Sequence, residues 1–386
     1  MRKPELPALT GVRFYAALLV FLSHVVVIPG MESLAGRHLV FDAGVVGVSF
    51  FFVLSGFILT YNYVDVFRSN LPLAGYKKFV WDRFTKIYPV HVAITLLMIP
   101  MQVFSPNLPL DWRAAPFHLL LLQCFWPSPV PLFYKYLNVP SWSISCEWFF
   151  YLLAPLAIYC VFGRRRRFIP FLFLAFYACV LGWLLHGSSG FAQLFYVSWF
   201  APSRLPEFLC GVLLAYLYVS FPSRQGAMAA GFLQFTGVAL ILLGAMGREH
   251  APWPFWGGLL YVPGSAILIY GLSQQKGVLA THLAHPWLGR LGTASFSFYL
   301  IHAPILRGLK ILWSHFGWQV TTWGGFAATT IIAYVAIQSL AMAVCYGYEI
   351  PVQRRLRSRM APREPAPEPE IRPDTPLRAR AASSST

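Results

Sequence analysis

Repeated apolar stretches are the feature that most constrains the fold of this chain. Runs of about 18 to 25 mainly apolar residues recur along the sequence, and each run is long enough to cross a bilayer as a helix. Charged residues make up only 11% of the 386 residues, against about 25% in soluble domains. Inside a bilayer, only helices and closed barrels satisfy their own backbone hydrogen bonds. We therefore predict an all-α polytopic membrane protein.

The apolar stretches predict about ten transmembrane helices. They cover residues 10–30, 40–62, 87–104, 142–162, 168–186, 205–222, 229–246, 256–273, 294–313 and 322–347. Basic residues gather before the first span and after every even-numbered span, which the positive-inside rule assigns to the cytoplasmic side. Both termini are then cytoplasmic. The net charge of +16 reflects this topology, so we expect no nucleic-acid partner.

Two segments differ from a simple span. The apolar run 116–126 is too short to cross a bilayer, so we interpret it as a re-entrant or interfacial helix in an outer loop over 105–141. Residues 353–386 are basic and rich in Pro, which predicts a disordered cytoplasmic tail after a membrane domain of residues 1–352. The six Cys form no CxxC pair, so no metal site is expected.

Two polar residues, Arg13 and His24, interrupt the first apolar run. Their spacing leaves about 20° of angular offset and roughly 16 Å of helical rise, so both side chains share one face. Ionisable groups in a membrane helix are costly and usually mark a functional site. His24 can act as a general base or accept an acyl group, with a helix contact as its structural alternative. Arg13 can bind an anion or anchor the helix at the cytoplasmic interface.

A polar stripe begins the fourth predicted span. Ser143, Glu147 and Tyr151 are four residues apart and lie along one helix face. A carboxylate just inside an apolar span needs a partner or a proton. Glu147 can therefore orient a histidine or bind a sugar hydroxyl, and its alternative role is a cap at the helix start with Ser143.

A basic and aromatic cluster, Arg83, Lys86 and Tyr88, lies at the cytoplasmic mouth of the third predicted span. The positive-inside rule alone would account for basic residues at this position. Guanidinium and ammonium groups also pair with phosphate, so a nucleotide-bearing cofactor from the cytosol can dock here.

Four further residues are candidates for binding a substrate. His302 lies near the middle of the ninth span and is either a second site residue or a helix contact. Arg204 and Glu207 begin the sixth span three residues apart and can simply pair with each other. Trp142 adjoins the Ser143 stripe. By contrast, the small residues within 44–57 are expected to serve close helix packing.

These clusters, in this order, resemble the acyltransferase 3 family over residues 5 to 350. Five motifs carry the resemblance: Arg-x10-His at 13–24, Phe-Phe-Val-Leu-Ser-Gly-Phe at 51–57, Arg-x-x-Lys-Ile-Tyr-Pro at 83–89, Trp-Ser-x-Ser-x-Glu at 142–147 and Ser-Phe-Ser-x-Tyr-Leu-Ile-His at 295–302. The resemblance implies an integral-membrane O-acyltransferase of the bacterial inner membrane, similar to O-antigen and exopolysaccharide acetylases. The family often has Arg-x-Arg-x-x-Arg before Ile-Tyr-Pro, whereas Trp81 and Lys86 occupy the outer positions here.

The resemblance also implies a donor and an acceptor. An acyl group, most often acetyl, would pass from coenzyme A to a hydroxyl of a surface polysaccharide, a lipid-linked glycan or a glycoside. Arg13, Arg83 and Lys86 would hold the donor phosphates, and the thioester would reach His24. Glu147, nearer the outer face, would orient His24 or the acceptor. Two alternatives remain open: a transporter or flippase of a lipid-linked sugar, and an acyltransferase acting on a glycosylated antibiotic.

Overall fold

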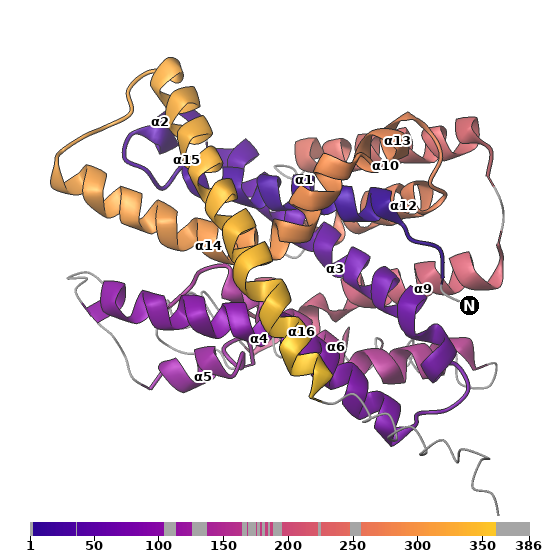
Figure 1. Cartoon of the computed structure of the whole chain (residues 1–386). Coiled ribbons are helices and arrows are strands. Elements are labelled where there is room, and N and C mark those ends of the chain that lie inside the picture. Colours follow the sequence, from indigo (N-terminus) through magenta and orange to yellow (C-terminus); the bar gives the residue numbers. More distant parts are fainter. Residues whose placement is uncertain are drawn as a thin grey trace, which may run out of the picture.

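The computed structural model describes residues 3–35, 37–103, 113–125, 137–163, 195–222, 225–247 and 256–359, with a few short pieces between 168 and 187. Every regular element in this part of the chain is a helix (Figure 1), which confirms the all-α prediction.

The longer helices are α1 (Pro7–Val25), α3 (Arg37–Phe67), α4 (Leu73–Val103), α6 (Ser141–Phe162), α9 (Leu205–Ser220), α10 (Ala227–Gly247), α12 (Val262–Ser273), α14 (Pro286–His315), α15 (Trp323–Val344) and α16 (Ile350–Ser358). A π-helical turn, η4 (Cys345–Glu349), joins α15 to α16. Figure 1 shows these last three elements as one long helix across the bundle. The shorter elements are α2 (Met31–Ala35), α5 (Ala115–Leu119), η2 (Ala201–Arg204), α11 (Trp256–Leu259) and α13 (Val278–Leu283).

Six helices in the described part are long and apolar enough to cross a membrane. They span Pro7–Val25, Ala43–Phe67, Leu73–Met101, Ser141–Phe162, Ala227–Gly247 and Trp323–Ser358. The predicted spans 205–222, 256–273 and 294–313 fall on helices outside these six, and most of the predicted span 168–186 lies outside the described residues. The chain is therefore a multi-pass membrane protein, while the count of ten and the orientation stay predictions.

The helix ends differ from the sequence-based boundaries at two places. α4 begins at Leu73, not near residue 87, so the basic cluster lies inside a helix rather than in the loop before one. This half of α4 contacts two neighbouring helices, because the Tyr76 hydroxyl donates to the carbonyl of Leu152 on α6 and the Trp81 indole N–H donates to that of Leu356 on α16. The final helix continues to Ser358, beyond the predicted boundary at 352, and Arg357 lies 3.2 Å from the carboxylate of Asp82 on α4. The rest of the predicted tail, from residue 360, lies outside the described residues.

The centre of the bundle is formed by α1, which packs against α3 and α14, and by α3, which packs against α9. Glycine makes the second crossing close: a Cβ built on Gly56 would lie 2.0 Å from the carbonyl oxygen of Phe208, and one on Gly211 would lie 2.0 Å from that of Val53. This confirms that small residues within 44–57 serve helix packing.

The predicted short helix at 116–126 is partly confirmed, because α5 covers Ala115–Leu119 and turns follow it. The segment is tied to its neighbours by polar contacts. The Tyr88 hydroxyl of α4 donates to the carbonyl of Leu120 at 3.1 Å, and the Ser145 hydroxyl of α6 donates to that of Leu121 at 2.7 Å. α5 and the turns after it are therefore held against α4 and α6. The flanking residues 104–112 and 126–136 lie outside the described part of the chain.

Candidate active site

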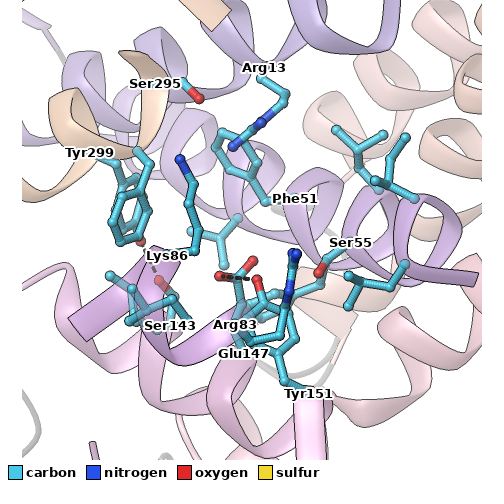
Figure 2. A pocket seen from close by; sticks show the side chains of 18 residues that line it. Arg13, Phe51, Ser55, Arg83, Lys86, Ser143, Glu147, Tyr151, Ser295 and Tyr299 are labelled. Carbon is cyan, nitrogen blue, oxygen red and sulfur yellow. Dashed lines mark hydrogen bonds between the residues drawn. The ribbon is translucent and has the colours of Figure 1, made fainter. Parts of the chain in front are cut away.

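A pocket with about 920 Å³ of unfilled space lies among α1, α3, α4, α6 and α14 (Figure 2). Its polar lining residues come from all five helices: Arg13, Ser55, Arg83, Lys86, Ser143, Glu147, Tyr151, Ser295 and Tyr299. Most of the remaining lining is aliphatic or aromatic, including Phe51 and Ile58. The pocket, which we call the first pocket, thus combines apolar walls with convergent charges.

Three cations face the first pocket. Arg13 comes from α1, and Arg83 and Lys86 are one turn apart on α4. In Figure 2, Arg13 enters from the side opposite Glu147 and Tyr151. Within the described part of the chain, the buried Nε of Arg83 and the buried hydroxyl of Ser295 have no hydrogen-bond partner. Because unpartnered buried polar groups are costly, these atoms indicate room for a polar ligand.

The predicted stripe on α6 faces the first pocket. The Tyr151 hydroxyl donates to Glu147 Oε2 at 3.2 Å, and the hydroxyls of Ser143 and Tyr299 are 2.6 Å apart. Figure 2 draws both hydrogen bonds. Glu147 therefore lies in the same pocket as Arg13, Arg83 and Lys86. The expectation that Glu147 is nearer the outer face and orients His24 or the acceptor stays a prediction.

His24 is not among the residues that line the first pocket, and it contacts the second predicted histidine. His302 Nε2 lies 3.4 Å from His24 Nδ1, and the ring centroids are 5.1 Å apart. Each Nδ1 also faces a backbone carbonyl, that of Val20 at 2.8 Å from His24 and that of Phe298 at 3.3 Å from His302. The tautomer that satisfies these contacts has both protons on Nδ1, which leaves Nε2 of His24 as its basic nitrogen.

The His24–His302 pair is connected to the first pocket through α14. The ring of His302 lies 5.8 Å from that of Tyr299, and Tyr299 lines the pocket. His302 is fully buried. His302 is therefore a helix contact that lies beside the predicted reactive residue, and its role as a second site residue stays a prediction.

Arg204 and Glu207 form a separate buried cluster. Their ion pair spans 3.0 Å, with side chains 9% and 2% exposed, which confirms the expected pairing. The Arg204 guanidinium also lies over the rings of Phe52, at 5.4 Å, and Trp142, at 5.9 Å. None of Arg204, Glu207 and Trp142 lines the first pocket. Arg204 is thus the common partner of Glu207, Phe52 and Trp142 in a cluster outside the first pocket.

Tyr88 also lies outside the first-pocket lining, although the sequence placed it with Arg83 and Lys86. Two residues along a helix correspond to about 200° of rotation, so Tyr88 faces away from Lys86. Its ring stacks on that of Phe84 at 4.3 Å, and its hydroxyl bonds the carbonyl of Leu120. Because α4 is one continuous helix here, Tyr88 and Lys86 point in different directions, and the grouping expected from the sequence does not include Tyr88.

Glu349 is a site residue that sequence reasoning missed. It lies in the π turn η4, is 1% exposed, forms an ion pair with Lys86 and accepts a hydrogen bond from Ser297. The sequence feature that could have indicated this residue is a single carboxylate just after the last apolar run. π turns often occur at functional sites. Counting Glu349, three cations and two carboxylates meet here, which leaves a formal surplus of one positive charge.

The fold and site define a multi-pass membrane protein with a buried, cation-lined pocket beside a histidine pair. A family model described as an acyltransferase domain matches residues 6–346. The chain therefore belongs to the acyltransferase 3 family and is a membrane acyltransferase.

Relatives with known names support this assignment. The chain is 30% identical to acyltransferase MdmB of Streptomyces mycarofaciens, over 95% of this chain and 96% of that protein. It is 27% identical to the peptidoglycan O-acetyltransferase OatA of Listeria monocytogenes, over 72% of this chain and 49% of that protein. It is 23% identical to the O-acetyltransferase OatA of Staphylococcus aureus, over 78% and 50% respectively. The match thus spans about half the length of the two OatA proteins. No solved structure matches the chain.

Proposed function

We propose that this protein transfers an acyl group, with acetyl as the first choice, from acyl-coenzyme A to a hydroxyl of a sugar. The acceptor is a surface polysaccharide, a lipid-linked glycan or a glycoside, and the enzyme works in a bacterial inner membrane with both termini in the cytoplasm. The observation that carries the proposal is the convergence of Arg13, Arg83 and Lys86 on one pocket in a chain of the acyltransferase 3 family. Family membership also favours an enzyme over a transporter or flippase.

The first pocket suits an anionic donor. Two carboxylates leave one of the three cations unneutralised, and the buried Arg83 Nε offers a donor that still needs an acceptor. Guanidinium groups pair well with phosphate oxygens. The apolar part of the lining suits the flexible pantetheine arm that carries the thioester. In this proposal, Arg13, Arg83 and Lys86 hold the diphosphate of the donor.

His24 performs the chemistry in this proposal. Its Nε2 takes the proton of the acceptor hydroxyl, and the hydroxyl oxygen attacks the thioester carbon. The carbon–sulfur bond then breaks, and coenzyme A leaves as a thiol after receiving that proton. A variant of this route places the acyl group on His24 first and on the acceptor second. His302 fixes the His24 ring, while Glu147 and Ser143 orient the acceptor or the thioester.

The acceptor class is supported by the relatives. The Listeria relative is named a peptidoglycan O-acetyltransferase, and this favours a surface glycan as the acceptor. The chain also matches MdmB over nearly all of that acyltransferase, but only half of OatA. An acceptor other than a cell-wall polymer, such as a small glycosylated antibiotic, is therefore the second candidate.

Turnover by purified protein in lipid nanodiscs tests the donor and His24 together. The assay measures release of coenzyme A thiol from acetyl-coenzyme A in the presence of a glycan or glycoside extract that supplies the acceptor hydroxyl. His24→Ala should lower turnover by about 10²–10⁴-fold, the usual contribution of a general base. The matched control is His315→Ala, because His315 is an exposed histidine at the end of α14 and should leave turnover unchanged. Near-normal turnover by His24→Ala would remove His24 from the mechanism.

The acceptor is identified in cells. Glycans and glycosides from cells with and without the protein are compared by mass spectrometry. A gain of one acetyl group on a glycan supports the first candidate, and the same gain on a small glycoside supports the second. Identical spectra from both cell types contradict acyl transfer to a sugar.

A further inference from the structure

A second pocket, with about 1,090 Å³ of unfilled space, lies at the N-terminal ends of α1 and α14. The polar residues that matter here are Lys3, Thr10, Asn62, Arg290, Thr293 and Tyr346. None of these residues lines the first pocket. The proposed function so far assigns no ligand to this second pocket.

The two pockets follow one another along the same three helices. On α1, Thr10 lines the second pocket and Arg13, one turn later, lines the first. On α14, Thr293 and Phe296 are related in the same way, and Ile58 of α3 lines both pockets. One helical turn is about 5.4 Å. The two pockets therefore lie next to each other along these helices, with Ile58 between them.

The second pocket has a mixed charge, in which Arg290 is the cation that forms no ion pair within the described residues and can meet an anionic group. Arg290 is exposed, and its guanidinium lies 5.0 Å from the centre of the Trp287 ring. Lys3 also lines the pocket and pairs with Asp65 at 2.8 Å. Glu5 is the acidic member of the lining. Hydroxyl and amide groups from Thr10, Asn62 and Thr293 supply uncharged hydrogen-bonding partners, and Tyr61 and Tyr346 supply aromatic rings.

We propose that the second pocket binds the 3′-phosphoadenosine end of acyl-coenzyme A. This inference rests on the proposed function, since it assigns the remaining part of the same donor. Arg290 pairs with the ribose 3′-phosphate, and the adenine lies against the aromatic rings. The donor then passes Ile58, which places its diphosphate at Arg13 and its pantetheine arm in the first pocket. The positive-inside rule assigns both Lys3 and Arg290 to the cytoplasmic side, where coenzyme A is available.

A donor without the nucleotide isolates the second pocket. Acetyl-pantetheine carries the thioester but has neither adenosine nor the 3′-phosphate. Arg290→Ala should raise the KM for acetyl-coenzyme A by about 5- to 20-fold, which lies between the effects of an exposed and a buried charged contact. The KM for acetyl-pantetheine should stay unchanged. Lys276→Ala is the matched control, because Lys276 is exposed, is assigned to the same side and lines neither pocket.

A second variant and an inhibitor test the same assignment without relying on the charge of Arg290 alone. Thr293→Phe fills the second pocket and should show the same selectivity for the nucleotide-bearing donor. Adenosine 3′,5′-bisphosphate should compete with acetyl-coenzyme A on the wild type and lose potency on Arg290→Ala. Equal changes in KM for both donors would overturn the assignment.

Nanodiscs of two lipid compositions test whether Arg290 pairs with the phosphate of the nucleotide or with the phosphate of a lipid. If Arg290 served a lipid phosphate, its effect would be confined to nanodiscs with anionic lipid, which overturns the nucleotide assignment. The expected result is the same KM ratio in purely zwitterionic nanodiscs. Failure of the proposed function itself is distinguishable, because the wild type would then turn over neither donor.

Discussion

The ion pair between Lys86 and Glu349 connects three separate parts of the fold beside the first pocket. Lys86 comes from α4 and Glu349 from the π turn η4, and Ser297 of α14 donates a hydrogen bond to the same carboxylate. Glu349→Gln keeps the size of the side chain and most of its hydrogen-bonding capacity. It removes the negative charge, so Lys86 would lose its neutralising partner while remaining between packed helices.

The expected cost follows from the burial of the two side chains. Glu349 is 1% exposed and Lys86 is 24% exposed. Breaking a fully buried ion pair by removing one partner costs about 3–5 kcal/mol, whereas an exposed pair contributes about 0–1 kcal/mol. Lys86 also reaches the first pocket, where water can solvate its ammonium group. We therefore expect Glu349→Gln to lower the free energy of unfolding by about 1–3 kcal/mol.

A double-mutant cycle measures this interaction directly. The free energy of unfolding is measured in mixed micelles of increasing SDS content for the wild type, Lys86→Met, Glu349→Gln and the double variant. The coupling energy should be at least about 1 kcal/mol, because the double variant leaves no unpaired charge behind. A matched cycle on Lys3 and Asp65, whose side chains are 24% and 67% exposed, should give about 0–1 kcal/mol. Strictly additive effects at Lys86 and Glu349 would refute the claim that their pairing holds the helices together.

Three further predictions concern other parts of the fold. Gly56→Ala should destabilise by about 1–3 kcal/mol, because its Cβ would lie 2.0 Å from a carbonyl oxygen of α9. Gly231→Ala in α10 meets no atom within 4 Å and should leave the unfolding temperature unchanged or higher; equal losses for both would contradict the close-contact explanation. Glu207→Gln should cost about 3–5 kcal/mol in unfolding experiments, since Arg204 would stay buried without its partner, and wild-type stability would disprove this role. His302→Ala should lower kcat about tenfold or more with an unchanged KM for the donor, whereas a change in KM alone would assign His302 to donor binding.

Local patterns in the sequence were sufficient for the class of protein and for part of the site. The four-residue spacing of Ser143, Glu147 and Tyr151 predicted a common helix face, and all three line the first pocket. Arg13, predicted to share one helix face with His24, lines the same pocket, whereas His24 does not. The stripe on α6 was predictable because side-chain direction along a helix depends only on the rise and rotation per residue.

Helix boundaries were harder to predict. A hydropathy pattern places a helix start where apolar residues begin, so it began the third span near residue 87. The structure begins α4 at Leu73, because polar residues remain helical where a neighbouring helix covers them. Asp82, for example, lies against Arg357 of α16 at 3.2 Å. That contact joins residues far apart in the chain, and a short sequence window does not include both of them.

The sequence by itself determined an all-helical membrane protein with ionisable residues inside its apolar stretches, and its ordered motifs led to the acyltransferase 3 family. Only the tertiary structure decided which of those residues meet. It brought His24 to His302, gave Lys86 the partner Glu349, and turned Tyr88 away from the first pocket. The physical reason is that periodicity sets a side chain's direction on its own helix, whereas the crossing of helices sets what that side chain faces.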